Sequence, residues 1–266
     1  MSAETPALRR ADSNGVATLT LAAPSNRNAL SLLVIDQLIV ALAEIEKDPE
    51  VGAVVIEGEG PAFSSGHDLK EIQAHRNDTD RGAVYFEKLM RRCAELMRGL
   101  AEGPKPVVAA VEGVATAAGC QLVAACDLAI AGENARFALP GVNNGFFCST
   151  PLVAVGRAVS RKAAMELALT GEMIDARRAE TIGLVNRVVA QGRALTEAQA
   201  LAGKIATRSR PVIALGKRVF QRQIETTLGD AYRIASEAMI ENLGFADADE
   251  GISAFLEKRA PKWSEP

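Results

Sequence analysis

The chain has 266 residues, of which 48% are hydrophobic and 24% are charged, and its formal net charge at pH 7 is −3. This composition is typical of a soluble globular protein, and the length is sufficient to bury a sizeable core. The small negative charge favours neither nucleic acid nor an anionic membrane as a partner.

The first two thirds of the chain alternate between predicted strands and helices. An alternating pattern predicts a strand at Val16–Leu21, and apolar residues at helical spacing predict a helix over Ser31–Lys47. A second long helix is predicted from about Gly82 to Leu100. A second strand is predicted at Val51–Ile56, and its nearly continuous apolar sequence is typical of a strand covered on both faces. Further strands are predicted at Val107–Val111, Leu128–Ala131 and Val185–Val189.

The last third is different, because helix is predicted almost throughout from about Leu195 to Glu257. Breaks in this helical pattern are predicted near Arg210–Pro211, Thr227–Gly229 and Gly244. The predicted class is therefore α/β followed by a helical tail. We expect two regions, a core at 1–194 and a helical region at 195–266 that takes part in oligomerisation.

The cysteines and the N-terminal segment indicate in which cellular compartment the protein is expected. The four cysteines have no CxxC spacing and are expected to be free thiols, and the two histidines do not predict a metal site. The first fifteen residues lack the apolar segment of a signal peptide, and no apolar run reaches transmembrane length. We therefore expect a cytoplasmic protein without a metal.

Residues 113–127 read GVATAAGCQLVAACD, in which a strand, a turn of small residues and the start of a helix follow one another. Such a junction exposes main-chain N–H groups at a helix N-terminus, where they favour a phosphate or a developing oxyanion. Neither GxxxxGK[ST] nor GxGxxG is present. Small residues also suit tight helix–sheet packing, and this alternative stays open for the stretch alone.

A second loop, FSSGHDLKE at 63–71, also follows a predicted strand. Gly66 lets the backbone turn closely, and the N–H of His67 is a candidate second donor. Two main-chain donors from two loops, directed at one point, would polarise a carbonyl oxygen. The alternative is that the two loops are unrelated.

Four segments resemble the crotonase (enoyl-CoA hydratase/isomerase) family in order and spacing: AFSSGHDLKEI, VVAAVEGVATAAGCQLVAACDLAIAGENARFALPGV, ALTGEMIDARRAETIGLVNRVV and FLEKRAPKW. The resemblance covers roughly residues 16–263. It implies the crotonase (ClpP-like) fold of repeated ββα units, with a C-terminal helical region that helps to build a homotrimer or a dimer of trimers. It also implies an acyl-CoA or enoyl-CoA substrate, with no cofactor beyond the CoA of that substrate. The thioester oxygen would lie between the N–H groups of His67 and Ala118.

The chain departs from the family at the two glutamates that hold and activate water in a hydratase. Gln121 stands at the first position, in GCQL, and Gly141 stands at the second, in LPGV. Glutamine can orient a water molecule but cannot take its proton at neutral pH, and glycine has no side chain to do either. We therefore expect classical hydration to be very weak.

Four other acids are alternatives to the missing carboxylates. Glu133 is expected in a turn, Glu166 on a solvated helix face, and Asp127 in a capping or fold-stabilising role. Glu87, on the helix that follows the CoA loop, is a further candidate.

The segment NNGFFCSTP offers hydrogen-bonding and nucleophilic groups in place of the second glutamate. Gln121 and this segment, Asn143–Ser149, are expected to shape the acyl pocket. Cys148 is a candidate nucleophile if a base lies near it, and is otherwise an ordinary cysteine in an apolar site. The His67 side chain is expected to line the acyl or pantetheine channel.

Residues in the matching segments are candidates for binding CoA. Phosphates prefer Lys or Arg, and the pantetheine arm prefers backbone edges and apolar walls. The candidates are Arg27, Ala29, Ser65 and Lys70 near the two loops, and Phe255 and Lys258 near the C-terminus, where they would reach CoA from the same or a neighbouring subunit.

The sequence leaves three alternative functions open. The first is an enzyme that acts on acyl-CoA thioesters, nominally a hydratase-like lyase, with isomerisation and thioester hydrolysis as other reactions through the same enolate. The second is a non-catalytic acyl-CoA-binding or regulatory protein. The third is a structural subunit that binds no CoA.

Overall fold

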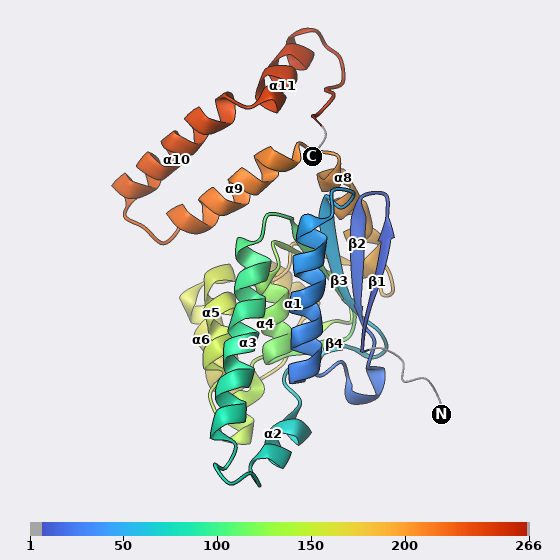
Figure 1. Ribbon diagram of the computed structural model, residues 1–266. Coiled ribbons are helices and arrows are strands. Elements are labelled where there is room, and N and C mark those ends of the chain that lie inside the picture. The colour runs from blue at the N-terminus through green and yellow to red at the C-terminus, as the bar shows by residue number, and fades with distance from the viewer. Residues whose placement is uncertain (1–6, 265–266) are drawn as a thin grey trace.

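The computed structural model describes residues 7–264, and its strands form two sheets (Figure 1). The larger sheet contains, in spatial order, β1 (Leu8–Ser13), β2 (Val16–Leu21), β3 (Ala53–Gly58), β5 (Val107–Val111), β7 (Leu128–Gly132) and β10 (Arg187–Val189). The smaller sheet contains, in spatial order, β4 (Ala62–Ser64), β6 (Val114–Thr116), β8 (Arg136–Ala138) and β9 (Ile174–Asp175).

The two sheets are built by a repeated unit. Strands β3, β5 and β7 lie parallel in the larger sheet, and each is followed along the chain by a strand of the smaller sheet, β4, β6 or β8. These three short strands are also parallel to one another. A helical segment then leads to the next unit, so the expected α/β fold of repeated ββα units is confirmed.

Helices cover the sheets and continue beyond them. Those of the first two thirds are α1 (Leu32–Lys47), α2 (Leu69–His75), α3 (Ala83–Glu102), α4 (Ala118–Ala125), α5 (Ser149–Ala158), α6 (Arg161–Thr170) and α7 (Ala176–Ile182). Those of the last third are α8 (Ala194–Ala206), α9 (Arg210–Gln223), α10 (Leu228–Leu243) and α11 (Ala246–Leu256). Short 3₁₀ helices occur at Pro24–Asn26 and Pro140–Asn144.

The central strands of the larger sheet, β3, β5 and β7, are buried on both faces, whereas the edge strand β1 is exposed. Val54 and Ile56 of β3 belong to the main core, together with α1, α3 and α4, whereas Ala53 and Val55 point to a second cluster. That second cluster is closed by α8, which presents three fully buried alanines at four-residue spacing, Ala194, Ala198 and Ala202. The predicted division at residue 194 therefore places in the helical region a helix that packs on the sheet.

Helices α9, α10 and α11 extend away from the sheets as an arm (Figure 1). The arm is fastened to the core by Lys217 of α9, whose ammonium group pairs with Asp127 and donates to the carbonyl of Leu100 at 3.3 Å. Asp127 also accepts from the N–H of Val107 at 2.8 Å. Both side chains are largely buried, so this pair joins α9 to α3 and to the residue that precedes β7.

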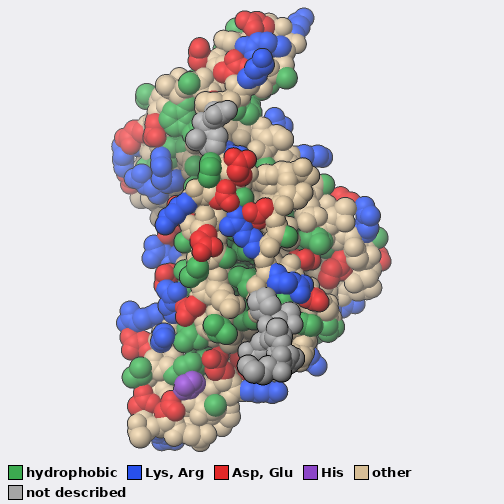
Figure 2. Space-filling view, turned by 45° about the vertical axis from the view of Figure 1, so that its right-hand side comes forward, with side chains coloured by type: hydrophobic (Ala, Val, Ile, Leu, Met, Phe, Trp, Pro, Cys, Tyr) green, Lys and Arg blue, Asp and Glu red, His purple; other side chains and the backbone are tan. Residues whose placement is uncertain are grey.

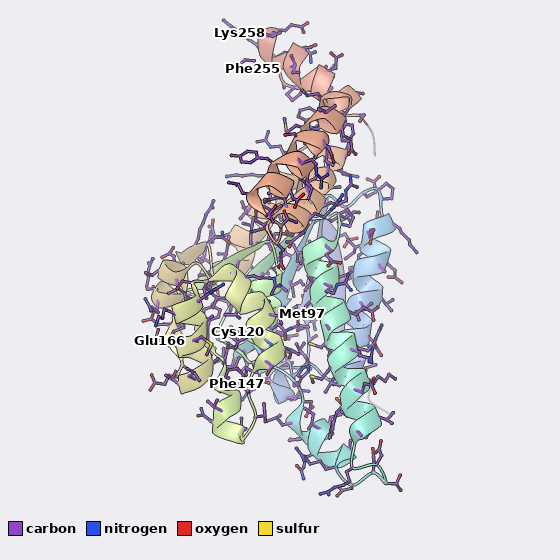
Figure 3. The ribbon with its side chains drawn as sticks, turned by 90° about the vertical axis from the view of Figure 1, so that its left-hand side faces the viewer. Met97, Cys120, Phe147, Glu166, Phe255 and Lys258 are labelled. Carbon is purple, nitrogen blue, oxygen red and sulfur yellow. The ribbon has the colours of Figure 1, made fainter. Side chains whose placement is uncertain are left out.

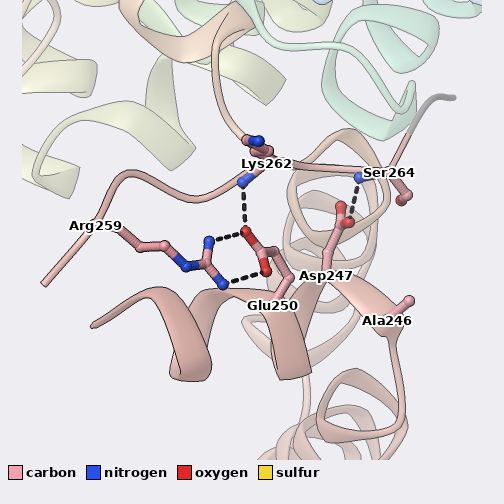
Figure 4. A pocket seen from close by; sticks show the side chains of 6 residues that line it. All are labelled: Ala246, Asp247, Glu250, Arg259, Lys262 and Ser264. Atoms are coloured by element: carbon pink, nitrogen blue, oxygen red, sulfur yellow. Dashed lines mark hydrogen bonds and ion pairs between the residues drawn. The ribbon is translucent and has the colours of Figure 1, made fainter. Parts of the chain in front are cut away.

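The chain ends in a segment that folds back on α11, and we call residues 259–264 the C-terminal clasp (Figure 4). Arg259 binds both carboxylate oxygens of Glu250 at 2.6 and 2.9 Å, and the N–H of Lys262 donates to the same carboxylate at 2.6 Å. The indole N–H of Trp263 donates to the carbonyl of Thr207 at 2.9 Å. The clasp thus ties the last helix of the arm to the end of α8.

Charges of both signs are mixed on the face of the molecule that Figure 2 draws. Lys and Arg are interspersed with Asp and Glu there, in keeping with the small net charge. Within residues 7–264, no helix combines the length and the apolarity needed to cross a membrane. The N-terminal segment considered for targeting lies only partly in this range, since its first six residues fall outside it.

Candidate active site

Two loops meet where the parallel strands β4 and β6 end, because Ser64 and Ala115 lie opposite each other in the register of the two strands. Gly66, in the loop after β4, has φ +88°. A Cβ atom at Gly66 would lie 2.9 Å from the Cβ of Ala117 and 3.0 Å from the main-chain nitrogen of Ala118. The backbone of the first loop therefore lies directly against the start of α4.

The start of α4 has an unusual backbone. Ala117 has φ 50° and ψ −119°, a conformation that costs a non-glycine residue free energy and that often occurs at functional sites. Its own N–H donates to the carbonyl of Ala138 at 3.0 Å, and no side chain caps the helix that follows. The strained residue thus presents the N–H groups of the first turn without a protein acceptor.

The N–H groups of His67 and Ala118 are free in the part of the chain that the structure describes, since neither donates to a protein acceptor there. They come from the two loops that Gly66 brings into contact. Two unsatisfied donors at a helix N-terminus can stabilise negative charge on an oxygen placed between them. The geometry is suited to an oxyanion hole.

Tight packing and exposed donors occur together in this stretch. A Cβ atom at Gly119 would lie 2.2 Å from the carbonyl oxygen of Ser64, so only glycine lets α4 approach β4 this closely. The small residues at 115–119 therefore allow close packing, and the same stretch leaves main-chain N–H groups at the start of α4 without a protein acceptor. Close packing of the helix is what brings its N-terminus to the loop of His67.

A third loop, 27–30, holds the first one in place. The N–H of Ser65 donates to the carbonyl of Arg27 at 3.0 Å, and the N–H of Leu30 donates to that of Gly66 at 2.7 Å. Asn28 anchors this loop: it is 2% exposed, and its amide donates to the carbonyls of Glu59 at 2.9 Å and Ala62 at 2.7 Å.

Asn28 is a residue that the sequence analysis missed. Its side-chain oxygen also accepts from the N–H of Ala23 at 2.9 Å. Arg27 and Asn28 both have positive φ, at 57° and 53°. A signal was present, because asparagine tolerates this backbone region better than most residues and occurs in turns for that reason.

Four of the CoA-binding candidates lie on these neighbouring loops. Ala29 is buried and Ser65 is half-buried beside it, whereas Arg27 and Lys70 are exposed. Neither basic side chain forms an ion pair with any residue in the range 7–264. Both charges are thus available to a phosphate.

Gln121 lies one turn inside α4 and is buried, with 3% of its surface exposed. Its side-chain oxygen accepts a weak hydrogen bond from the thiol of Cys93, on α3, at 3.8 Å. Burial raises the pKa of Cys93 to about 12, so this group is a neutral thiol at pH 7. The first glutamate position is therefore occupied by a neutral amide in a largely apolar site.

Gly141 is buried in a closed turn and has no room for a side chain. A Cβ atom there would lie 2.7 Å from the carbonyl oxygen of Phe146 and 2.8 Å from the Sγ of Cys148. The N–H of Gly141 donates to the same sulfur at 3.3 Å. The space that a glutamate would need is filled by the loop itself.

Cys148 is 4% exposed, and burial raises the pKa of its thiol, although the N–H of Gly141 opposes the shift. A neutral, buried thiol is a poor nucleophile. In contrast to Cys148, residues 143–147 of the same segment are exposed. This segment offers polar groups at the surface but no activated cysteine.

The alternative acids are engaged elsewhere. Glu87 pairs with Arg91 one helical turn away at 2.7 Å, on an exposed face. Glu166 pairs with Arg178 at 3.3 Å and lies on the outside of α6 (Figure 3). Glu133 accepts from the N–H of Gln191 at 3.4 Å, in the turn after β7.

Phe255 and Lys258 do not join the two loops within one chain. Figure 3 places both at the far end of the arm, away from Cys120 of α4. Phe255 is 81% exposed. Any contact between these residues and the site near Ala118 would have to come from another copy of the chain.

Comparison with known proteins shows the family to which the chain is similar. A family model for enoyl-CoA hydratase/isomerase matches residues 11–266. The chain is 46% identical to the rat protein named enoyl-CoA hydratase domain-containing protein 3, mitochondrial, over 94% of this chain and 82% of that relative. It is 40% identical to a putative enoyl-CoA hydratase of Thermus thermophilus, over 93% of this chain and 97% of the relative.

Solved structures give the same result. The crystal structure of human enoyl-CoA hydratase domain-containing protein 3 matches with a TM-score of 0.91 and 43% identity, over 97% of this chain and 100% of that one. The enoyl-CoA hydratase of Mycobacterium smegmatis matches with a TM-score of 0.91 and 48% identity, over 97% of this chain and 99% of that one. The crotonase fold is therefore confirmed.

The prediction of a cytoplasmic protein is wrong, because the relatives from rat, human and mouse, at 45–46% identity, are named mitochondrial proteins. Free thiols are compatible with any reducing compartment, so they could not single out the cytosol. The fold and the sequence similarity together give the assignment: the chain belongs to the enoyl-CoA hydratase/isomerase family.

Proposed function

We propose that the protein binds acyl-CoA thioesters and polarises the thioester carbonyl with the N–H groups of His67 and Ala118. The observation that supports this proposal is the close approach of Gly66 to Ala117 and Ala118, because the N–H groups of His67 and Ala118 belong to the loops that meet there and donate to no protein acceptor among residues 7–264. Polarisation of the carbonyl favours an enolate, and removal of one such donor typically costs about 3–4 kcal/mol of transition-state stabilisation.

Hydration of short enoyl-CoA should be very weak. The buried amide of Gln121 cannot take a proton from water at pH 7, and Gly141 has neither a side chain nor room for one. Isomerisation and thioester hydrolysis remain candidate reactions through the same enolate. The turn packed around Gly141 also favours a second candidate function, acyl-CoA binding without turnover.

CoA would be held at its phosphates by Arg27 and Lys70, whose charges are unpaired within residues 7–264. Ala29 and Ser65 would border the pantetheine arm. Phe255 and Lys258 would approach the adenine end from a neighbouring subunit, because the arm carries them away from the site of their own chain.

We also propose that the protein forms a homotrimer or a dimer of trimers. Several large apolar side chains of the arm are more than two thirds exposed in the single chain, namely Leu228, Tyr232, Ile240, Phe255 and Leu256. Exposed apolar surface of this extent is typical of a protein–protein interface. Light scattering should give three or six times the mass of the chain.

Two measurements on the purified protein test the function. Calorimetry with acetyl-CoA and crotonyl-CoA should detect binding, and the absorbance of the enoyl group should decay at a rate near the background. Rapid hydration would contradict the role given to the missing carboxylates. Failure of every thioester to bind would refute the proposed function and favour a structural subunit.

A further inference from the structure

Gln121 carries the one amide among the buried side chains of α4, and this amide is only half paired. Its oxygen lies 3.8 Å from the Sγ of Cys93, on α3. Its Nε2 donates to no atom of residues 7–264, and it is not sealed from solvent, unlike the Nε2 of His67. The amide nitrogen therefore keeps two N–H donors that a bound group can reach.

Cys93 determines which end of the amide is free. Cys93 is fully buried, and burial raises the pKa of its thiol, so the sulfur carries a proton that it can donate. Within the described part of the chain, the oxygen of Gln121 is the only acceptor for this proton. In the opposite orientation of the amide the thiol would lose that acceptor, and sulfur accepts only weakly from an N–H group in return. The contact therefore favours the amide oxygen towards α3 and the nitrogen away from it.

The free amide nitrogen lies beside the proposed oxyanion hole. Gln121 follows Ala118 by three residues, and residues at this spacing share a helix face, with their Cβ atoms about 5–6 Å apart. Side chains of a helix also lean towards its N-terminus, which is the end where the N–H of Ala118 is free. A thioester whose oxygen accepts from Ala118 therefore brings its first acyl carbons next to Gln121.

The surroundings of this nitrogen suit a neutral acceptor. The buried residues of α3 and α4 include no carboxylate and no cation. A carbonyl oxygen can accept from the amide without carrying a charge, whereas a carboxylate buried without a cation costs much more free energy. The group that best matches the amide is therefore a ketone rather than an acid.

We infer that Gln121 donates a hydrogen bond to a carbonyl oxygen on C3 of the acyl group, and that Cys93 is the residue that positions its amide. The preferred ligand is then a 3-oxoacyl-CoA thioester. One of its two oxygens can accept from His67 and Ala118 while the other accepts from Gln121. The enolate of such a thioester shares its charge between both oxygens, so each charged oxygen would have a donor. This inference rests on the proposed function and extends it to a class of ligand.

Calorimetry with two matched thioesters tests the inference. The probes are butyryl-CoA and 3-oxobutanoyl-CoA, which have the same chain length and differ only in the carbonyl group at C3. We expect the 3-oxo ligand to bind about five- to tenfold more tightly, as one added hydrogen bond in a largely apolar site allows. Equal or weaker binding of the 3-oxo ligand would overturn the inference alone. If neither thioester binds, the proposed function fails as well, so the two failures are distinguished.

A variant at Gln121 then assigns the preference to its amide. The quantity compared is the ratio of the two dissociation constants, because a general loss of stability weakens both ligands alike. Gln121→Leu has a side chain of similar size without a donor, and it should make the two affinities equal. A ratio that stays at the value of the parent protein in this variant would overturn the inference.

Variants at Cys93 test its positioning role. Cys93→Ser keeps a donor for the amide oxygen and should retain the preference for the 3-oxo ligand. Cys93→Ala should lose most of the preference, because the amide can then turn either way. Cys126→Ala is the matched control, since the thiol of Cys126 donates to the carbonyl of Leu122 at 3.2 Å, at the other end of α4. A preference that survives undiminished in Cys93→Ala would overturn the role given to Cys93.

Discussion

A Cβ atom at Gly141 would lie 2.8 Å from the Sγ of Cys148, so a thiol fills the space next to the position where the sequence analysis expects the second glutamate of a hydratase. The carbonyl oxygen of Phe146 closes the same space from another direction, at 2.7 Å. The loss of the second carboxylate is thus coupled to the path of the whole turn. A single substitution cannot reverse it.

The first prediction concerns that turn. Gly141→Glu should lower the free energy of unfolding by about 1–3 kcal/mol, because the buried turn must move to admit the side chain. The variant should gain no hydration of crotonyl-CoA, alone or together with Gln121→Glu. Chemical denaturation and the enoyl absorbance measure the two effects.

The control for this prediction is Gly156→Glu. Gly156 lies in α5, and nothing comes within 4 Å of a Cβ atom there. The Gly156→Glu variant should therefore lose much less free energy of unfolding than the Gly141→Glu variant. Recovery of rapid hydration in the double variant at 121 and 141 would show that the turn opens more easily than its packing indicates.

The second prediction concerns the contact of the two loops. Gly66→Ala should cost about 1–2 kcal/mol from the positive φ alone, and more from the approach to Ala117. Acyl-CoA binding should weaken by at least tenfold, because the N–H groups of His67 and Ala118 would be pushed apart. Calorimetry with acetyl-CoA provides the measurement.

A matched glycine serves as the control. Gly99 lies in α3 with open space around its Cβ position, so Gly99→Ala should leave binding unchanged and slightly stabilise the protein. If Gly66→Ala and Gly99→Ala both bound acetyl-CoA as tightly as the parent protein, the prediction that the loop contact supports binding would be contradicted.

The third prediction concerns Asn28. Replacement by alanine removes its two donated hydrogen bonds and leaves the carbonyls of Glu59 and Ala62 with one partner fewer in a buried position. Asn28→Ala should lower the unfolding free energy by about 1–3 kcal/mol and weaken acyl-CoA binding through the loop of Ser65. Asn77→Ala, at an exposed position after α2, should do neither.

The fourth prediction concerns pH and the C-terminal clasp. Arg259 and the N–H of Lys262 lower the pKa of Glu250 from 4.5 to about 2. A lowered carboxyl pKa contributes stability that is fully present above pH 4.5 and is lost as the pH falls towards 2. The clasp should therefore detach over this range.

Fluorescence measures this detachment, because Trp263 is the single tryptophan of the chain. Its emission should shift to the red as its contacts with Thr207 and Gly251 are lost. Glu250→Gln should show the shifted emission already at pH 7, whereas Glu237→Gln, on the exposed face of α10, should behave like the parent. An emission maximum that is constant down to pH 2 in the parent would contradict the assigned role of Glu250.

The sequence predicted the long elements well, because their apolar patterns are strong. The helix at Ser31–Lys47 and the strands at Val16–Leu21 and Val107–Val111 are found with nearly the same bounds, as are the breaks before α9, α10 and α11. Strand β1, with the sequence LRRADS, was not predicted, because it is an edge strand with exposed polar residues on both faces. The three-residue strands of the smaller sheet are too short to show any periodicity.

The parts of the candidate site that arise from short sequence motifs could be predicted from the sequence. The parts that arise from contacts between residues far apart in the chain could not. The strand–turn–helix pattern indicated the donors at Ala118, and the meeting of the two loops followed from the resemblance rather than from spacing. The roles of Asn28 and of the Gly141 turn depend on contacts across 31 to 34 residues, or on the volume filled by Phe146 and Cys148. Neither volume nor long-range contact can be read from residue order.

The central claim is that two main-chain amides from separate loops bind one thioester carbonyl. A crystal structure with acetyl-CoA or crotonyl-CoA tests it most directly. The account predicts a carbonyl oxygen about 3 Å from the nitrogen atoms of both His67 and Ala118. A thioester bound with its carbonyl away from these two nitrogens would contradict it.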